Sequence, residues 1–215
     1  PFSRPLSVRP PFAPEAVRLG VPSASGRTFF GDGAAEEAFD ALLERLPALG
    51  IAPVEIDFAP FREVAALLYE GPWVAERHVV VAGLLARDPD AILPVTRTVI
   101  GRAEGQSAAD AFRAVYRLKA LAREVERAMD GLDGLLVPSV PTWPTLEAVA
   151  ADPIGENSRL GTYTNFVNLL DLPAISVPAG FRADGLPQGL MLIGASLSDA
   201  RLAAFAAALE AAAAL

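Results

Sequence analysis

Apolar positions along the chain alternate between short runs and longer stripes with helical spacing. Short apolar runs are typical of strands, whereas apolar residues three and four positions apart indicate one face of a helix. The runs predict strands over residues 17–21, 54–58, 134–138, 174–179 and 189–195. The stripes predict helices over residues 33–49, 60–69, 72–86, 107–129 and 197–215. Strands that alternate with helices in this way predict a layered α/β fold in one domain.

The helix over residues 107–129 is the most strongly marked of these elements. Ser107 and Asp110 stand three residues apart, where a capping box places its hydroxyl and its carboxylate. An apolar stripe follows at helical spacing, formed by Phe112, Val115, Leu118, Ala122, Val125 and Met129. We expect this stripe to face the core.

The composition fits a protein with one buried core and argues against a nucleic-acid surface. Hydrophobic residues make up 52% of the 215 residues, which is enough for a sizeable core. The formal net charge is -8 and no basic stripe with interleaved aromatic residues occurs, so we expect no nucleic-acid partner. No apolar segment is long enough to span a bilayer and no cysteine is present, so we expect no membrane partner and a cytoplasmic location.

The side chains that catalyse acyl transfer are scarce in this sequence. Such catalysis needs a nucleophile, a base within hydrogen-bonding reach and oxyanion donors. The chain has no cysteine, one histidine, His78, and one lysine, Lys119. No G-x-S-x-G sequence occurs, and no serine lies three or four residues from Lys119 on its predicted helix. We therefore expect no catalytic residue and no metal site in this chain; a distant serine folded against either base stays open.

Two segments resemble a known family. Residues 68–77 read LYEGPWVAER, with a tyrosine and an arginine eight residues apart across a Gly-Pro break. Residues 157–181 read NSRLGTYTNFVNLLDLPAISVPAGF, a polar segment that runs into an apolar strand. Together they resemble the amidase signature family, and within it the allophanate hydrolases. The resemblance implies a layered α/β/α sandwich with a mixed sheet, and no metal or organic cofactor.

The resemblance also places the chain within the family's domain. Residues 1–215 are expected to form the C-terminal portion of a single amidase-signature domain. The family's Ser–Ser–Lys catalytic groups belong to a Gly/Ser-rich upstream segment, and this chain contains no such segment. We therefore expect the chain alone to be inactive, with the recognition half of the site but not the catalytic half.

Tyr69 and Arg77 are the substrate-binding residues that the resemblance assigns. In allophanate hydrolases the matching pair recognises the substrate, whose carboxylate the arginine holds. A planar guanidinium suits this task because it can donate to both carboxylate oxygens. Asn165, in the polar segment before the strand, is a third expected contact. The structural alternative is that Arg77 stacks on Trp73, four residues away on one helix, while Tyr69 only fills space.

Other polar segments are expected to be structural. Residues 1–14 hold five prolines, which predicts an extended connector. Ser176 lies in an apolar strand and is predicted to be a core hydroxyl. The acidic clusters at 36–37 and 88–90 are interpreted as solvated helix ends, and the glycine-containing sequences at 31–33 and 185–189 as turns. A site contact and a hydrogen-bonded loop are both open for Asn157, Ser158, Arg159, Tyr163, Thr164 and Asn168.

The sequence leaves three functions open. The first is part of an allophanate hydrolase, which hydrolyses a C–N bond of allophanate in urea-related nitrogen catabolism and whose partner is a small anionic amide. The second is part of a generic amidase or of the amidase subunit of an amidotransferase. The third is a non-catalytic module that kept the fold and lost the chemistry. A homodimer is open in each case.

Overall fold

The computed structural model describes residues 17–213, so the connector expected over residues 1–14 lies outside the described residues. In the described part of the chain, one mixed sheet has the strand order β2-β1-β3-β5-β4. β1 runs parallel to β2 and β3, whereas β5 runs antiparallel to β3 and β4. The expected mixed sheet is confirmed. The strands are β1 (Val17–Pro22), β2 (Ile51–Ile56), β3 (Gly134–Pro138), β4 (Ala174–Phe181) and β5 (Pro187–Ile193).

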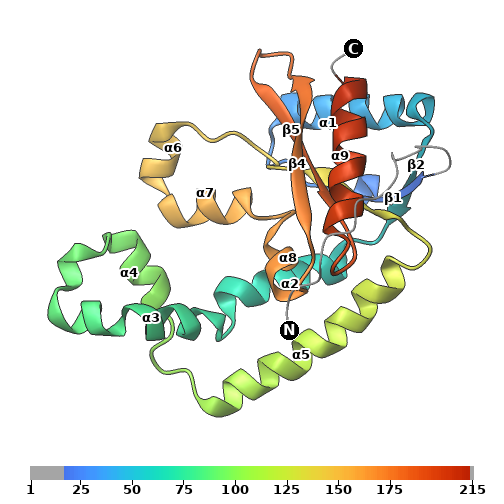
Figure 1. Ribbon diagram of the computed structural model, residues 1–215. Coiled ribbons are helices and arrows are strands. Elements are labelled where there is room, and N and C mark those ends of the chain that lie inside the picture. Colours follow the sequence, from blue (N-terminus) through green and yellow to red (C-terminus); the bar gives the residue numbers. More distant parts are fainter. Residues whose placement is uncertain (1–16, 214–215) are drawn as a thin grey trace.

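Helices cover both faces of this sheet, as the expected sandwich requires (Figure 1). One face carries α1 (Gly33–Arg45) and α9 (Asp199–Ala213). The other face carries α2 (Ala59–Glu70), α5 (Ala108–Ala128) and α8 (Asn165–Leu169). The remaining helices are α3 (Trp73–Arg87), α4 (Pro94–Gly101), α6 (Leu146–Ala151) and α7 (Pro153–Leu160). Within residues 17–213, short 3-10 turns occupy Ala24–Gly26, Leu46–Leu49 and Pro89–Ala91.

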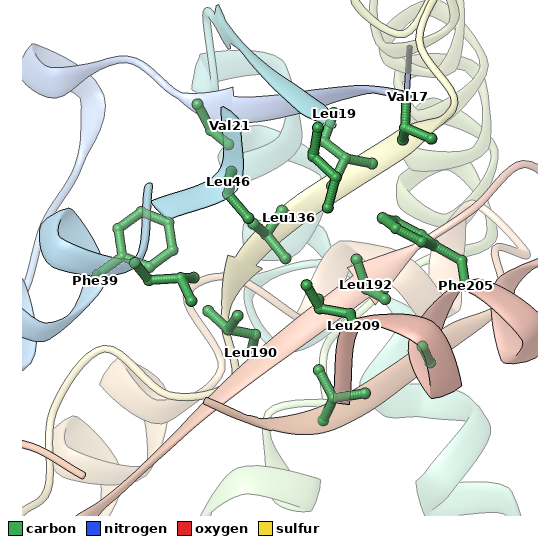
Figure 2. Packing of buried hydrophobic residues seen from close by; sticks show 14 of the residues in the cluster. Val17, Leu19, Val21, Phe39, Leu46, Leu136, Leu190, Leu192, Phe205 and Leu209 are labelled. Carbon is green, nitrogen blue, oxygen red and sulfur yellow. The ribbon is translucent and has the colours of Figure 1, made fainter. Parts of the chain in front are cut away.

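The core consists of two clusters, one on each face of the sheet. In β3, Leu136 belongs to the first cluster, while Leu135 and Val137 belong to the second. Successive side chains of a strand point to opposite faces, so a strand covered on both faces is apolar throughout. Figure 2 shows the first cluster, in which Phe39 of α1 and Phe205 of α9 lie on either side of the strand residues. The second cluster is rich in aromatic rings. The rings of Phe58 and Phe61 are stacked, with 4.7 Å between their centres.

Most predicted elements are confirmed to within two residues, but α1 and β2 differ. The helix expected over 33–49 is α-helical only as far as Arg45 and continues as the 3-10 turn Leu46–Leu49. The strand expected over 54–58 runs from Ile51 to Ile56. It starts directly after Gly50, which ends the preceding 3-10 turn with a left-handed φ of 77° that glycine adopts without strain. Pro53 is tolerated because β2 lies at the edge of the sheet. Asp57 belongs to the turn into α2, since its carboxylate accepts a hydrogen bond from the Ala59 amide.

The strand predicted over residues 174–179 is present as β4, but only one of its faces is buried. Val177 is buried against the α9 side, whereas Ala174, Ser176 and Pro178 on the other face are exposed. β4 is the edge strand of the sheet, and helices of the described chain cover only one of its faces. Ser176 is therefore an exposed hydroxyl and not the predicted core hydroxyl.

The prediction for α5 is half right. The capping box is present, because Ser107 accepts a hydrogen bond from the Asp110 amide and Asp110 accepts one from the Ser107 amide. The apolar residues of α5 that join the second core cluster lie in its C-terminal half, where Leu121 and Val125 are buried. The N-terminal half projects beyond the sheet, which leaves Phe112 62% exposed (Figure 1). Two buried residues of α5, Ala114 and Leu121, are not members of the predicted stripe, so the stripe locates the core-facing side of the helix only approximately.

Four helices were not predicted: α4, α6, α7 and α8. They are five to eight residues long, too short for an apolar stripe to repeat. Local caps explain two of them, since Thr145 accepts from the Ala148 amide before α6 and Asp152 accepts from the Gly155 amide before α7. No helix within residues 17–213 combines the length and the apolar character needed to cross a membrane.

Candidate functional site

A cavity of about 450 Å³ lies where the end of α2 meets α3, α4, α7 and the start of α8. Most of its wall comes from the short helices that the sequence pattern did not predict. The three residues proposed from sequence for substrate binding, Tyr69, Arg77 and Asn165, all line it. The other lining residues are Val95, Thr96, Val99, Ile100, Arg102, Pro153, Ile154, Asn157 and Ser158.

A corner between α2 and α3 brings Tyr69 and Arg77 together. α2 ends at Glu70, Gly71 is its extended C-cap, and Pro72 precedes the first residue of α3. A Cβ on Gly71 would lie 2.6 Å from the Leu67 carbonyl oxygen, so a side chain at this position would force the corner open. Proline suits the start of a helix because its missing N–H would have no partner there. The Gly-Pro break therefore determines where Arg77 points.

The guanidinium carbon of Arg77 lies 5.1 Å from the centre of the Tyr69 ring. This distance is within the range of a cation–π contact. The ring partner of Arg77 among the described residues is thus Tyr69, and not Trp73 as the structural alternative expected. Both side chains are half-buried at the cavity wall. The Arg77 guanidinium makes no ion pair within residues 17–213, so its N–H donors are available for a ligand.

The charged side chains that line the cavity within the described residues are all positive, in a protein of formal net charge -8. Among residues 17–213, the charged residues of its lining are Arg77 and Arg102, and no aspartate or glutamate of this part of the chain lines it. Neither arginine makes an ion pair with a carboxylate in the part of the chain that the structure describes. An unpaired guanidinium has donors in the planar arrangement that binds a carboxylate. The cavity therefore suits an anionic group.

Asn165 is the first residue of α8, and its amide lies directly over Gly161. A Cβ on Gly161 would overlap this amide, so only glycine at that position leaves room for the Asn165 side chain. The neighbouring polar groups are used within α7: the Asn157 amide donates to the Pro153 carbonyl at 2.7 Å, and the Ser158 hydroxyl donates to the Ile154 carbonyl at 2.8 Å. Asn157 and Ser158 thus already use hydrogen-bonding groups within α7, and these groups are less available to a ligand.

A second cavity, of about 340 Å³, lies beyond Tyr69, Ser158 and Asn165, which line both cavities. Its wall includes Phe30, which adopts a left-handed φ of 54° and lies under the guanidinium of Arg159. Bulky residues rarely adopt this conformation. The remaining lining residues could not be predicted from the sequence, because they come from segments far apart in the chain. They are Thr28, Phe30, Arg62, Ala65, Ala66, Glu70, Gly161 and Thr162.

Tyr163 holds the loop that carries Thr28 and Phe30. It is buried, and its hydroxyl accepts a hydrogen bond from the Thr28 amide at 2.8 Å and donates one to the Thr28 carbonyl at 3.1 Å. Burial raises the pKa of this phenol above its usual value, against the opposing effect of the Thr28 amide. Tyr163 is therefore a structural residue beside the site and not a contact of the first cavity.

Replacing Tyr163 by phenylalanine is expected to lower the free energy of unfolding by about 1–3 kcal/mol, because it leaves two part-buried backbone groups of Thr28 without their partner. Denaturant unfolding measures the change. Tyr116→Phe is the matched control. Tyr116 is 65% exposed, so this substitution should leave the free energy of unfolding almost unchanged. Equal losses in both variants would show that the Thr28 hydrogen bonds are not the cause.

The amidase family model matches residues 6–203, which is most of the chain. The chain belongs to the amidase family. The urea amidolyases of Lachancea kluyveri and Saccharomyces cerevisiae are 40% and 38% identical to it over 92% of its length, and it spans 11% of theirs. A Kluyveromyces lactis allophanate hydrolase structure matches with a TM-score of 0.90 and 36% identity, over 98% of this chain and 35% of that one.

More distant amidase relatives share mainly the fold. A solved amidase matches with a TM-score of 0.76 and 25% identity over 94% of this chain. A glutamyl-tRNA(Gln) amidotransferase structure from Thermotoga maritima matches with a TM-score of 0.64 and 21% identity over 91% of this chain. The allophanate hydrolase match is better on both measures, so the likeness expected from residues 68–77 and 157–181 is confirmed at the level of the whole described fold.

An amidase of this family needs a nucleophile and a base, and the described residues do not pair them. Lys119 is exposed on α5 and His78 is half-buried on α3, and neither is hydrogen-bonded to a serine within residues 17–213. Ser139 and Ser176 share a hydrogen bond of 2.6 Å without a basic partner in this part of the chain. No cluster of His, Cys, Asp or Glu among the described residues could hold a metal ion.

Proposed function

We propose that this chain is the substrate-recognition part of the amidase domain of an allophanate hydrolase, in urea-related nitrogen catabolism. The observation that carries the proposal is a cavity in which Arg77 lies over the Tyr69 ring and has no carboxylate partner, and to whose lining residues 17–213 contribute no acidic side chain. The urea amidolyase and allophanate hydrolase relatives support it. Residues 1–215 would form the C-terminal portion of one amidase-signature domain, acting in the cytoplasm.

In the proposed complex the carboxylate of allophanate lies against Arg77. The guanidinium donates two parallel N–H···O hydrogen bonds to the two carboxylate oxygens, a geometry that a lysine cannot reproduce. The Tyr69 ring holds the guanidinium plane, and the tyrosine hydroxyl supplies a second polar contact. Asn165, on the wall shared by both cavities, offers an amide to the urea-like part of the substrate. These contacts fix the far end of the substrate and so position the bond to be cleaved.

The reaction is hydrolysis of the terminal C–N bond of allophanate. Water supplies the oxygen of the new carboxylate and the amide nitrogen leaves as ammonia. The amidase family carries out this step through an acyl-enzyme, in which a serine is activated through a second serine by a lysine. We place those catalytic groups outside the described residues, because Lys119 and His78 have no serine partner there. The isolated 215-residue chain is therefore expected to release no ammonia.

Two alternatives make different predictions about the cavity. A generic amidase or the amidase component of an amidotransferase has no need of an arginine that reads a carboxylate at position 77. A non-catalytic module could keep Arg77 and bind the anion without cleaving it. The unpaired arginine disfavours the first alternative, and turnover by the complete protein would exclude the second.

Ammonia release by the complete protein that contains this chain tests the proposal, with allophanate and biuret as substrates. Biuret has the same skeleton, but a neutral carboxamide replaces its carboxylate. We expect kcat/KM to be much higher for allophanate, because only allophanate can pair with Arg77. Where biuret binds without being cleaved, its inhibition constant serves as the neutral reference. Equal or better performance with biuret would refute carboxylate recognition, and binding of allophanate without ammonia release would indicate the non-catalytic module.

A further inference from the structure

Arg102 is a second cation of the first cavity that sequence reasoning did not single out. It directly follows α4, whose buried Ile100 anchors the end of that helix and whose side packs on α3. Its side chain is exposed, yet it lines the cavity with Arg77. The polar lining between the two comes from neutral side chains such as Thr96. Both charges therefore line one cavity, and no carboxylate from the described part of the chain lies in its wall.

The lack of an acid partner distinguishes Arg102 from many arginines of this chain. Eight arginines within residues 17–213 form ion pairs with aspartate or glutamate. Arg102 makes none in that part of the chain, although acidic residues outnumber basic residues by 26 to 18 in the sequence. An unneutralised charge at the rim of a concave, water-accessible site raises the local concentration of ions of opposite sign.

A purely structural role is the competing explanation for Arg102. A cation at the end of a helix interacts favourably with the carbonyl groups of the last turn. Arg87 provides the comparison, because it is the exposed last residue of α3, forms no ion pair within the described residues and does not line the cavity. If helix capping were the whole role, the two arginines would behave alike.

We propose that Arg102 is the steering cation of this cavity: it draws the anionic amide to the opening, while Arg77 holds it. The inference rests on the proposed function, because it assigns a further specificity residue to the same site. Steering acts at a distance on the approaching ion and needs charge but no fixed geometry. Arg102 should thus contribute to kcat/KM for anionic substrates and leave kcat nearly unchanged.

The test compares the Arg102→Gln, Arg102→Lys and Arg87→Gln variants of the complete protein at low and high salt. For Arg102→Gln with allophanate in about 0.01 M salt, we expect kcat/KM to fall roughly threefold to tenfold, within the range of electrostatic steering. The loss should disappear in about 1 M salt, where the screening length falls to about 3 Å. Arg102→Lys should retain the wild-type value because it keeps the charge. Arg87→Gln, with the same change in net charge, and biuret with any variant should show no effect.

Three outcomes would overturn the inference. The first is an unchanged kcat/KM in Arg102→Gln at low salt. The second is an equal loss with allophanate and biuret, or a loss that persists at high salt. The third is a loss reproduced by Arg87→Gln, which would reflect net charge alone. Arg77→Ala separates this failure from that of the proposed function: if Arg77→Ala still impairs allophanate selectively, only the role of Arg102 is wrong, whereas if it does not, carboxylate recognition itself is wrong.

Discussion

Replacing Asp32 by alanine is expected to lower the free energy of unfolding by about 3–5 kcal/mol, the usual cost of removing one partner of a buried ion pair. Arg182, whose side chain is 5% exposed, donates to both Asp32 oxygens at 2.9 Å. Asp32 also caps α1 by accepting from the Ala35 amide, and it accepts from the Thr142 hydroxyl and the Trp143 amide. One carboxylate thus ties α1 to the end of β4 and to the loop after β3.

Asp184→Ala is the matched control for this prediction. Asp184 pairs with the same arginine at 2.7 Å, but its side chain is 42% exposed, so water can replace it. We expect a much smaller loss of stability than for Asp32→Ala. Denaturant unfolding of both variants measures the difference. Similar losses in the two variants would mean that burial of the Asp32–Arg182 pair adds nothing to the free energy of unfolding.

The same pair predicts a dependence of stability on pH. Burial raises the pKa of Asp32, but the hydrogen bonds from Arg182 and from two backbone amides outweigh it, so the net pKa lies below the usual value of 3.8. A carboxyl whose pKa is lower in the folded state stabilises the fold above its unfolded pKa. That stability is lost as the pH falls below about 3.8 and through the lowered pKa. The loss should be shallower in Asp32→Ala.

The fold was largely predictable because apolar runs and stripes report local structure. β3 and most of the predicted helices lie within two residues of their predicted bounds. Burial was less predictable, since it depends on what covers each face. Ser176 lies in an apolar strand but at an uncovered edge, and Phe112 belongs to a regular stripe on a helix end that projects beyond its partner. Neither fact is encoded in local spacing.

The candidate site was predictable only where one short segment carried it. Tyr69 and Arg77 lie eight residues apart across one corner, so a motif could identify the pair, and its recognition role stays a prediction. Arg102 comes from a short helix without a motif. Asp32 was interpreted as part of a turn, yet its main partner, Arg182, is 150 residues away in the sequence. Pairs of this kind depend on the assembled sheet and leave no local signal.

Arg77→Ala should have the largest functional effect in the complete protein. Truncating one side of a desolvated, hydrogen-bonded charge pair costs roughly 2–5 kcal/mol, which corresponds to about a thirtyfold to several-thousandfold loss of kcat/KM for allophanate. Arg77→Lys should recover only part of this loss, because an ammonium group cannot donate in the bidentate geometry. Biuret has no carboxylate to lose and should be far less affected. Steady-state ammonia release measures all three values.

The most direct test of carboxylate recognition is the ratio of kcat/KM for allophanate to kcat/KM for biuret, measured in the complete protein and in its Arg77→Ala variant. We predict that the ratio falls by at least about thirtyfold in the variant, with an unchanged melting temperature. A structural arginine that merely covers the Tyr69 ring would instead impair both substrates alike and lower the melting temperature. An unchanged ratio would contradict the assignment of Arg77 as the residue that binds the substrate carboxylate.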